Sequence, residues 1–121
     1  MCGIGGLLKK SQSGLDETVQ KMVAAIRHRG PDDSGFWTDP SAGIALAHTR
    51  LSILDVSSEG HQPMRSASGR YIIAFNGEIY NHRELRQEHR EIVWRGHSDT
   101  ETLLACIEAV SYTHVTLPTK A

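Results

Sequence analysis

Apolar residues in this chain occur in short segments with two different periods, and this pattern excludes many kinds of fold. No apolar run in the 121 residues approaches the ~20 residues of a membrane-spanning helix. Some apolar residues recur at helical spacing, whereas others form short runs of the kind that is typical of buried strands. The chain is long enough for one domain at most, and we expect that domain to contain both helices and strands.

One helix is predicted to begin close to residue 14. Five residues share the 3.6-residue period and would form one apolar stripe: Leu15, Val19, Met22, Val23 and Ile26. Ser13 is a plausible N-cap for this helix. The Gly-Pro pair at residues 30–31 is predicted to end it, with basic residues close to its negative end.

Two more helices are predicted downstream. Asn81 and Glu84 have the spacing of a helix start, and this short helix would end near residue 88. Ser-Asp-Thr-Glu at residues 98–101 is a capping-box pattern and opens the next helix. The apolar residues of that helix are Leu103, Leu104, Ile107 and Val110.

Strands are predicted between and beside these helices. The segments are residues 4–8, 44–48, 51–54, 70–75 and 91–95. The segment 70–75 runs into Asn76-Gly77, the leading signal for a two-residue hairpin turn, so we expect it to pair with residues 79–80.

Composition excludes several classes of function. Apolar residues make up 39% and charged residues 22%, which is typical of a globular rather than a disordered chain. The formal net charge is −1 and the two signs are mixed, so we expect neither nucleic acid nor membrane as a partner. The apolar start lacks the features of a secretory signal, and Cys2 and Cys106 make no disulfide framework. A cytoplasmic compartment is therefore expected.

Cys2 is the strongest candidate for chemistry. A thiol at such a position is usually a small buried side chain, but removal of Met1 would free the α-amino group beside it. An α-amino group has a reference pKa of about 7.7–8.0, so it can take the thiol proton and later return it to a leaving amine. Cys2 is thus a candidate N-terminal nucleophile.

Several motifs in the right order make the chain resemble a known family. The opening Met-Cys-Gly-Ile is that of class II glutamine amidotransferases, a branch of the N-terminal-nucleophile hydrolases. The segments at residues 27–32, 48–55, 75–81 and 98–101 are similar to the glutamine-hydrolysing asparagine synthase pattern within that family. The resemblance extends over residues 1–109, which would form the N-terminal part of the amidotransferase domain. Residues 110–121 do not match and are either an extension or foreign sequence.

The resemblance implies catalytic roles for Cys2, Asn76 and Gly77. Cys2 would attack the side-chain amide of glutamine, which places negative charge on the amide oxygen. The side-chain N–H of Asn76 and the backbone N–H of Gly77 would receive that charge as an oxyanion hole. The alternative for Asn76-Gly77 is a simple tight turn, and a turn can also carry two donors.

The resemblance also implies a glutamine-binding set. Arg50 would hold the α-carboxylate with two parallel hydrogen bonds, and Glu78 and Asp99 would hold the α-ammonium. The alternatives are a surface ion pair for Arg50, an exposed hairpin carboxylate for Glu78 and a helix cap for Asp99. Asn76 and Gly77 belong to this set as well, and the backbone of four consecutive residues would line the same pocket: Leu51, Ser52, Ile53 and Leu54.

The remaining candidate residues are predicted to have structural roles and no part in the chemistry. The Arg-Gly-Pro-Asp loop at residues 29–32 is expected to shape the side of the pocket, and Cys106 is expected to be core. The histidines show no metal-ligand spacing, so no metal is expected in this chain: His28, His48, His61, His82, His89, His97 and His114.

The family relationship implies more protein than this chain contains. The implied fold is the four-layer αββα sandwich of N-terminal-nucleophile hydrolases, of which we expect this chain to supply about the first half. In the family, a second domain uses ATP and magnesium to activate aspartate through a Ser-Gly-Gly-x-Asp-Ser loop, which is absent from this sequence. Expected partners are L-glutamine and that synthetase domain, with a homodimer as one assembly of the full-length protein. Unpaired sheet edges and marginal folding are expected for the isolated chain.

Three functions remain open from the sequence. The first is glutamine hydrolysis through a thioester on Cys2, with the ammonia used in the full-length protein to amidate aspartate or another acid. The second is a catalytically inactive glutamine-binding fragment. The third is another N-terminal-nucleophile hydrolase, such as an amide acylase, against which Arg50 and the Arg-Gly-Pro-Asp loop argue.

Overall fold

A computed structural model describes residues 2–10, 14–51 and 58–120, with the backbone alone for 111–120. These residues form an α+β fold. In chain order its elements are β1 (Gly3–Leu8), α1 (Leu15–Ile26), the 3₁₀ helix η1 (Arg27–Arg29), β2 (Asp33–Asp39), β3 (Ile44–Arg50), the 3₁₀ helix η2 (Ser58–Gly60), β4 (Met64–Arg65), β5 (Ile72–Ile73), α2 (His82–Glu88) and α3 (Asp99–Lys120).

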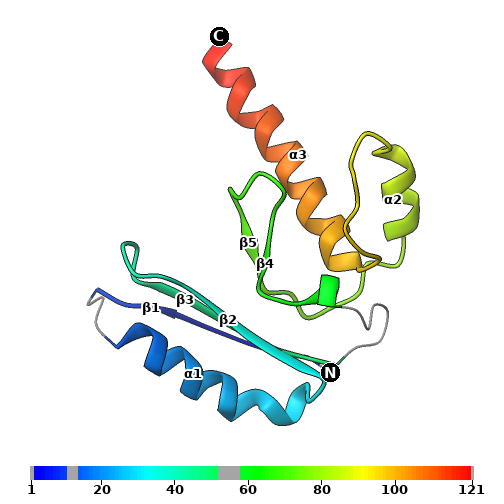
Figure 1. The fold of residues 1–121 in the computed structure, drawn as a ribbon. Helices are drawn as coiled ribbons and strands as arrows, with labels where there is room; N and C mark the ends of the chain where they lie inside the picture. The colour runs from blue at the N-terminus through cyan, green and yellow to red at the C-terminus, as the bar shows by residue number, and fades with distance from the viewer. Residues whose placement is uncertain (1, 11–13, 52–57, 121) are drawn as a thin grey trace.

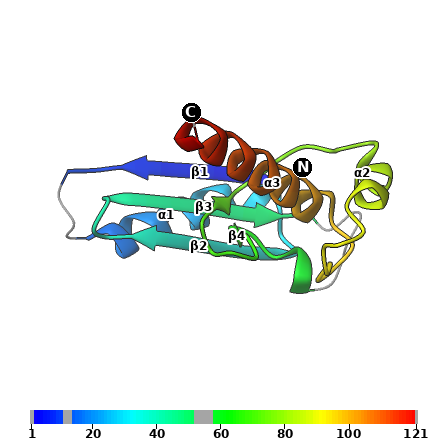
Figure 2. The ribbon, with the colours of Figure 1, turned by 90° about the horizontal axis from the view of Figure 1, so that it is seen from above.

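The first part of the chain builds a three-stranded antiparallel sheet with a helix on one face. β3 lies between β1 and β2, as Figure 2 shows from above. α1 packs against one face of this sheet (Figure 1). Small strand residues meet the predicted apolar stripe of the helix in the core cluster of Leu15, Val19, Val23, Ala45 and Ala47. The predicted α1 and the predicted strands at β1 and β3 are therefore confirmed.

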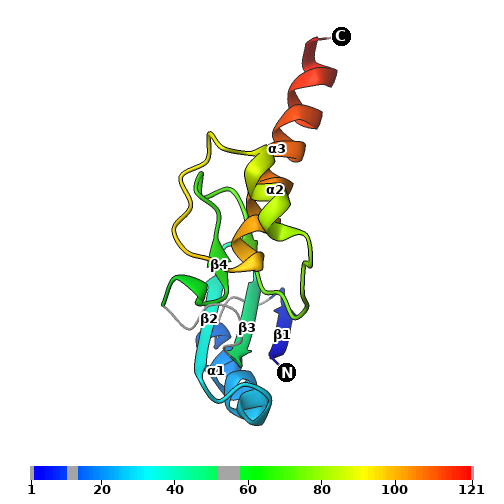
Figure 3. The same ribbon diagram turned by 90° about the vertical axis from the view of Figure 1, so that its right-hand side faces the viewer.

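The second part of the chain lies over the opposite face of the sheet. Successive strand residues point to opposite faces, so Leu46, His48 and Arg50 point away from α1. In Figure 3 the sheet and α1 lie at one end of the molecule, and α3 extends away at the other. This opposite face is only partly covered, because Ile4 is 51% and Leu8 78% exposed.

The hairpin predicted at Asn76-Gly77 is wrong. β5 is shorter than predicted and pairs with β4, and the connection between them contains Gly69 at φ 77°. Gly77 does not have a positive φ. The backbone after β5 is instead bound by side chains, because the N–H groups of Phe75 and Ile79 donate to Gln62 and Asp99. No cross-strand ladder forms there.

One further strand prediction is wrong, and another falls mostly outside the described residues. The segment 91–95 is irregular, because the N–H groups of Arg95 and Gly96 donate to the Glu101 carboxylate at 2.7 and 2.9 Å instead of to a strand. In the segment 51–54, Leu51 is not in a strand, and 52–54 lie outside the described residues. β2 was not predicted, since its sequence begins Asp-Ser-Gly and carries no clear apolar alternation.

The helix starts are close to the predictions. The N-cap of α1 is Gly14, and Ser13 lies outside the described residues. η1 and Gly30 follow α1, as the Gly-Pro pair predicts. In α3 the Ser98 hydroxyl accepts a hydrogen bond from the Glu101 N–H at 3.2 Å, which is one half of a capping box.

The helix α3 is less buried than its apolar pattern predicts. Leu104 is 2% exposed, but Ile107 and Val110 are 39% and 56% exposed. The helix continues through residue 110 to Lys120, so the domain boundary predicted there stays a prediction. Within the described part of the chain, none of the helices has the length and hydropathy that a membrane crossing requires.

Candidate active site

A cavity of about 280 Å³ lies where β1 begins and β3 ends. Four parts of the chain line it: Cys2 with residues 50–51, Gly60 with Gln62, residues 75–78 with Tyr80, and the start of α3 at residues 98–100. Most of the site residues predicted from sequence meet here: Cys2, Arg50, Leu51, Asn76, Gly77, Glu78 and Asp99. Ser52, Ile53 and Leu54 lie outside the described residues. Segments that are far apart in the sequence thus line one cavity.

Cys2 is fixed at the cavity by the sheet. Gly3 pairs with Thr49 across β1 and β3, which brings the cysteine to the end of the central strand. The Cys2 Sγ accepts a hydrogen bond from the Leu51 N–H at 3.3 Å, and Arg29 Nε donates to the Cys2 carbonyl at 3.2 Å. A Cβ at Gly3 would lie 2.8 Å from Thr49 Oγ1, so only glycine fits directly after this cysteine.

Arg50 lines the cavity from β3 and is 7% exposed. Its guanidinium packs on Gly60, where a Cβ would lie 2.6 Å from Arg50 Cζ. Its backbone is held from the other side, because the Asp32 N–H donates to the Arg50 carbonyl at 3.0 Å. The predicted Arg-Gly-Pro-Asp loop therefore lies beside the cavity and fixes the strand that carries Arg50.

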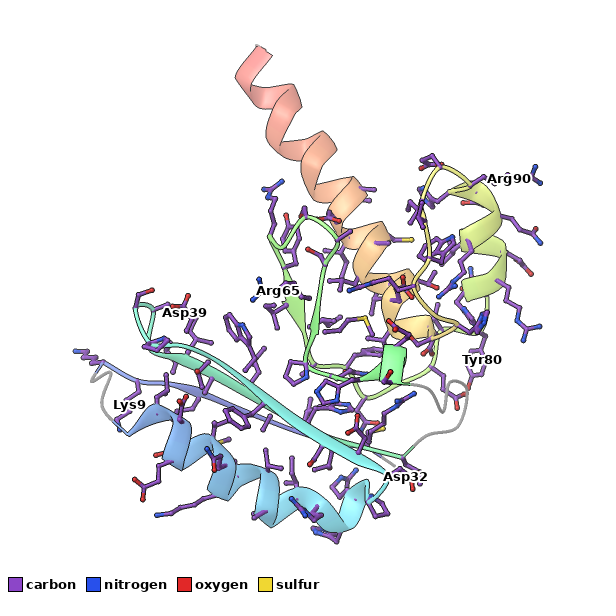
Figure 4. The ribbon with its side chains drawn as sticks, viewed as in Figure 1. Lys9, Asp32, Asp39, Arg65, Tyr80 and Arg90 are labelled. Atoms are coloured by element: carbon purple, nitrogen blue, oxygen red, sulfur yellow. The ribbon has the colours of Figure 1, made fainter. Side chains whose placement is uncertain are left out.

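Two acidic residues, Asp99 and Glu78, line the same cavity as this cation. Asp99 is 6% exposed and begins α3, and its Oδ2 accepts a hydrogen bond from the Ile79 N–H at 2.9 Å. Glu78 is exposed and lies in the segment that Asp99 binds. Figure 4 marks the surroundings: Tyr80, which also lines the cavity, is below α2, and Asp32 is at the end of the sheet. One cation and two carboxylates suit a ligand that carries both charges.

The segment that carries Asn76 and Gly77 is anchored through Phe75. The Phe75 N–H donates to Gln62 Oε1 at 2.6 Å, and the Phe75 carbonyl lies 3.2 Å from His48 Nε2. A Cβ at Gly77 would lie 2.8 Å from Phe75 Cζ. A side chain at position 77 would therefore displace the Phe75 ring, whereas no positive φ at Gly77 demands glycine.

Sequence reasoning missed Gln62. Its side chain is 6% exposed and lines the cavity, and its Nε2 donates to Thr100 Oγ1 at 3.1 Å. Gly60, Phe75, Tyr80, Ser98 and Thr100 line the cavity as well. Gln62 lies in an irregular segment where no period or spacing signals burial, so no pattern in the sequence could have identified it.

His48 is completely buried beside the site. Burial lowers the pKa of this imidazole below its ordinary value, and the hydrogen bond to the Phe75 carbonyl acts in the opposite direction. A neutral ring must donate its Nε2 proton to that carbonyl, since a carbonyl cannot donate. The Nδ1 atom then has no hydrogen-bond partner among the described residues.

The remaining candidates lie elsewhere. Cys106 is half-buried on α3 and does not line the cavity. Burial raises the pKa of its thiol, and the nearby Glu88 carboxylate adds to that rise. Across residues 2–10, 14–51 and 58–110, no group of three or more His, Cys, Asp or Glu side chains is arranged to hold a metal ion.

Comparisons with known proteins show which family the chain resembles over most of its length. The family model for a glutamine amidotransferase domain matches residues 1–117. The chain is similar to the putative glutamine-hydrolysing asparagine synthetase 2 of Methanocaldococcus jannaschii, with 38% identity over 120 residues. That match covers 86% of the chain and 23% of the relative.

Two bacterial relatives give the same picture. Glutamine-hydrolysing asparagine synthetase 1 of Bacillus subtilis is 40% identical over 111 residues, covering 87% of the chain and 17% of the relative. Glutamine-hydrolysing asparagine synthetase B of Escherichia coli is 40% identical over 108 residues, covering 87% of the chain and 19% of the relative. The chain thus spans between 17% and 23% of the length of these three proteins.

Proposed function

The chain belongs to the glutamine amidotransferase family, and on that basis we propose that it hydrolyses glutamine to glutamate and ammonia through Cys2. The observation that carries the proposal is one cavity that is lined by Cys2, Arg50, Glu78 and Asp99. A free amino acid has a carboxylate and an ammonium group, so this set of charges is complementary to it.

In this proposal the charged residues orient the substrate. Arg50 binds the α-carboxylate of glutamine, and Asp99 and Glu78 bind its α-ammonium group. The rigid packing of Arg50 against Gly60 supports this role, because a fixed guanidinium loses little freedom when it binds. The side-chain amide of glutamine then extends toward Cys2.

The reaction follows two steps on the thiol. After removal of Met1, the α-amine of Cys2 takes the thiol proton, and the sulfur attacks the amide carbon. The N–H groups of Asn76 and Gly77 stabilise the oxyanion, and collapse transfers the proton to the nitrogen and releases ammonia. Water, deprotonated by the same amine, then attacks the thioester, which releases glutamate and regenerates the thiol.

The larger protein is part of the proposal. We propose that the described residues are about the first half of a four-layer αββα domain, and that a synthetase domain in a longer protein uses the ammonia to amidate aspartate. ATP and magnesium would belong to that domain, since this sequence has no Ser-Gly-Gly-x-Asp-Ser loop to hold them. A cytoplasmic homodimer is the assembly that we propose for the longer protein. The names of the relatives and their greater length support the part of this proposal that concerns a synthetase domain in a longer protein.

Intact-mass analysis after incubation with a diazoketone analogue of glutamine tests the nucleophile. We expect a chain without Met1 that carries one adduct, and no adduct on Cys2→Ala. A processed chain without adduct would contradict the proposal, and thermal stabilisation by glutamine without ammonia release would then identify an inactive binding module. Cleavage of bulky acyl amides but not of glutamine would instead identify an amide acylase.

A further inference from the structure

We propose that Gln62 and His48 are positioning residues that hold the backbone of Phe75, and with it the donors of Asn76 and Gly77, against Cys2. The inference rests on the proposed glutamine hydrolysis and extends it to two residues outside the substrate-binding set. Neither residue needs to contact glutamine for this role.

Phe75 is held at both of its backbone polar groups by side chains. Gln62 Oε1 accepts from the Phe75 N–H at 2.6 Å, and His48 Nε2 bonds the Phe75 carbonyl at 3.2 Å. These two side chains come from different parts of the chain, a loop after η2 and the central strand β3. The N–H belongs to the peptide group that precedes Phe75 and the carbonyl to the one that follows it, so both peptide groups are held and the next two residues start from a fixed direction.

Burial makes the clamp rigid. Gln62 is 6% and His48 0% exposed, and buried polar groups are costly when they lose a partner. The second end of Gln62 is also bound, because Nε2 donates to Thr100 Oγ1 at 3.1 Å. Gln62 therefore spans from Phe75 to the start of α3, where Asp99 lies.

The clamp connects segments that line the cavity. His48 is two residues before Arg50 on β3, whose end also carries the contact between Leu51 N–H and Cys2 Sγ. Gln62 also contacts the start of α3, through its hydrogen bond to Thr100. The position of Asn76 and Gly77 relative to the sulfur is thus set through Phe75. A misplacement of about 1 Å in such a constellation can cost about 100-fold in rate.

The test compares Gln62→Met with Gln62→Glu in the full chain. Methionine keeps the length of the side chain but cannot accept the Phe75 N–H. Glutamate keeps that acceptor, and the Thr100 hydroxyl can donate to its second oxygen. Oxyanion contacts exist only in the transition state, so we expect Gln62→Met to lower kcat for glutamine hydrolysis by about 10- to 100-fold with KM within about threefold. We expect Gln62→Glu to keep kcat within about threefold of the parent chain, because the clamp is restored.

A binding measurement separates positioning from loss of fold. The γ-aldehyde analogue of glutamine forms a tetrahedral adduct with the thiol, whereas L-glutamate binds without one. In Gln62→Met we expect the affinity for the aldehyde to fall about 10- to 100-fold, with glutamate affinity unchanged. His48→Leu should give the same pattern, and His48→Gln, which keeps a donor for the Phe75 carbonyl, should restore it.

The outcomes are distinct. If Gln62→Met has the parental kcat, or if the affinities for aldehyde and glutamate fall together, the positioning role is overturned while glutamine hydrolysis stands. If the parent chain neither hydrolyses glutamine nor binds the aldehyde, the proposed function fails first, and the positioning role fails with it.

Discussion

Arg50 is held from several directions in the structure. Gly60 packs on its guanidinium, and the loop that contains Asp32 binds its backbone. Its side chain is 7% exposed, although it carries a full charge. A cation fixed in this way is suited to recognise one anion in one orientation, which is the requirement for an α-carboxylate.

Arg50→Lys tests that recognition. Lysine keeps the charge but loses the planar fork, so we expect KM for glutamine to rise by about 10-fold or more with a smaller change in kcat. Steady-state ammonia release measures both constants. An unchanged KM would show that Arg50 does not bind the substrate.

The buried His48 predicts a dependence of stability on pH. Burial lowers its pKa from 6.5, and Arg50 and His61 lower it further, whereas the Phe75 carbonyl and Asp33 act in the opposite direction. As the pH falls from 7.5 through 6.5, the unfolded chain gains a proton at this residue before the folded chain does. The free energy of unfolding should therefore fall in this range, and it should stop falling below the folded-state pKa.

Denaturant unfolding at several pH values measures this effect. His48→Gln should reduce the slope of stability against pH between 7.5 and the folded-state pKa. Some slope should remain, because burial also lowers the pKa of His82. An identical slope in His48→Gln and in the parent chain would contradict the assignment.

Motifs could predict the charged site residues, but not the residues that hold them. Cys2 was singled out by its position after Met1, and Arg50 and Asp99 by their place in the motifs of the family that the chain resembles; all three line one cavity. Gln62 was missed, since its function depends on burial between two segments that are 13 and 38 residues away. Such contacts exist only after the chain has folded.

At the scale of elements, the start of α3 is fixed by a buried ionic cluster. Arg86 on α2 donates to Thr102 Oγ1 at 2.7 Å and to the carbonyls of Gly96 and Ser98 at 2.6 and 2.8 Å. Its guanidinium also lies 3.7 Å from the Glu101 carboxylate and stacks 4.3 Å from the centre of the Trp94 ring. The cluster docks α2 and the loop 89–97 onto the helix that carries Asp99.

Arg86→Met should destabilise this part of the molecule. It leaves the carboxylate of Glu101, whose side chain is 6% exposed, without its most buried partner, so we expect a loss of about 3–5 kcal/mol in the free energy of unfolding. Arg95→Met is the matched control, because Arg95 lies at 3.7 Å from the same carboxylate but is 45% exposed. We expect about 0–1 kcal/mol for the Arg95 pair itself. Equal losses in the two variants would contradict the role of Arg86.

Elements with a strong period were predicted, and elements defined by distant partners were not. α1 follows its apolar stripe, and β3 follows its apolar run. The segment 91–95 has the residues of a strand, but the Glu101 carboxylate occupies the N–H groups at its end. Asn76-Gly77 has the sequence of a turn, but the clamp on Phe75 and the bond from Ile79 to Asp99 keep it open.

At the scale of the whole molecule, many large apolar side chains remain exposed among the described residues. They are Ile4, Leu8, Phe36, Tyr80, Val93, Ile107 and Val110. The core beside α1 is small, and both β1 and β2 are edges of their sheet. Exposed apolar residues on unpaired edges favour association between chains, so the isolated chain should be marginally stable and prone to aggregate. A reversible, cooperative melt as a monomer would contradict this expectation.

Leu8→Lys should reduce that association without a cost in stability. Leu8 is 78% exposed on the edge strand β1, so we expect a change within about 0.5 kcal/mol in the free energy of unfolding and less light scattering at equal concentration. Leu15→Ala is the buried comparison, because Leu15 is 2% exposed and should lose about 2–5 kcal/mol. Unchanged light scattering in Leu8→Lys would show that this edge does not drive aggregation.

The position of Cys2 in the cavity lining decides at which end of the chain a purification tag can be attached. A purification tag fused ahead of Cys2 would turn its amine into an ordinary amide and would lie at the mouth of the cavity. The far end of α3 points away from the sheet in Figure 3, so a tag there is remote from the thiol. Protein with an N-terminal tag should resist diazoketone labelling until a protease removes the tag and exposes Cys2. Protein with a tag C-terminal to α3 should be labelled without that step.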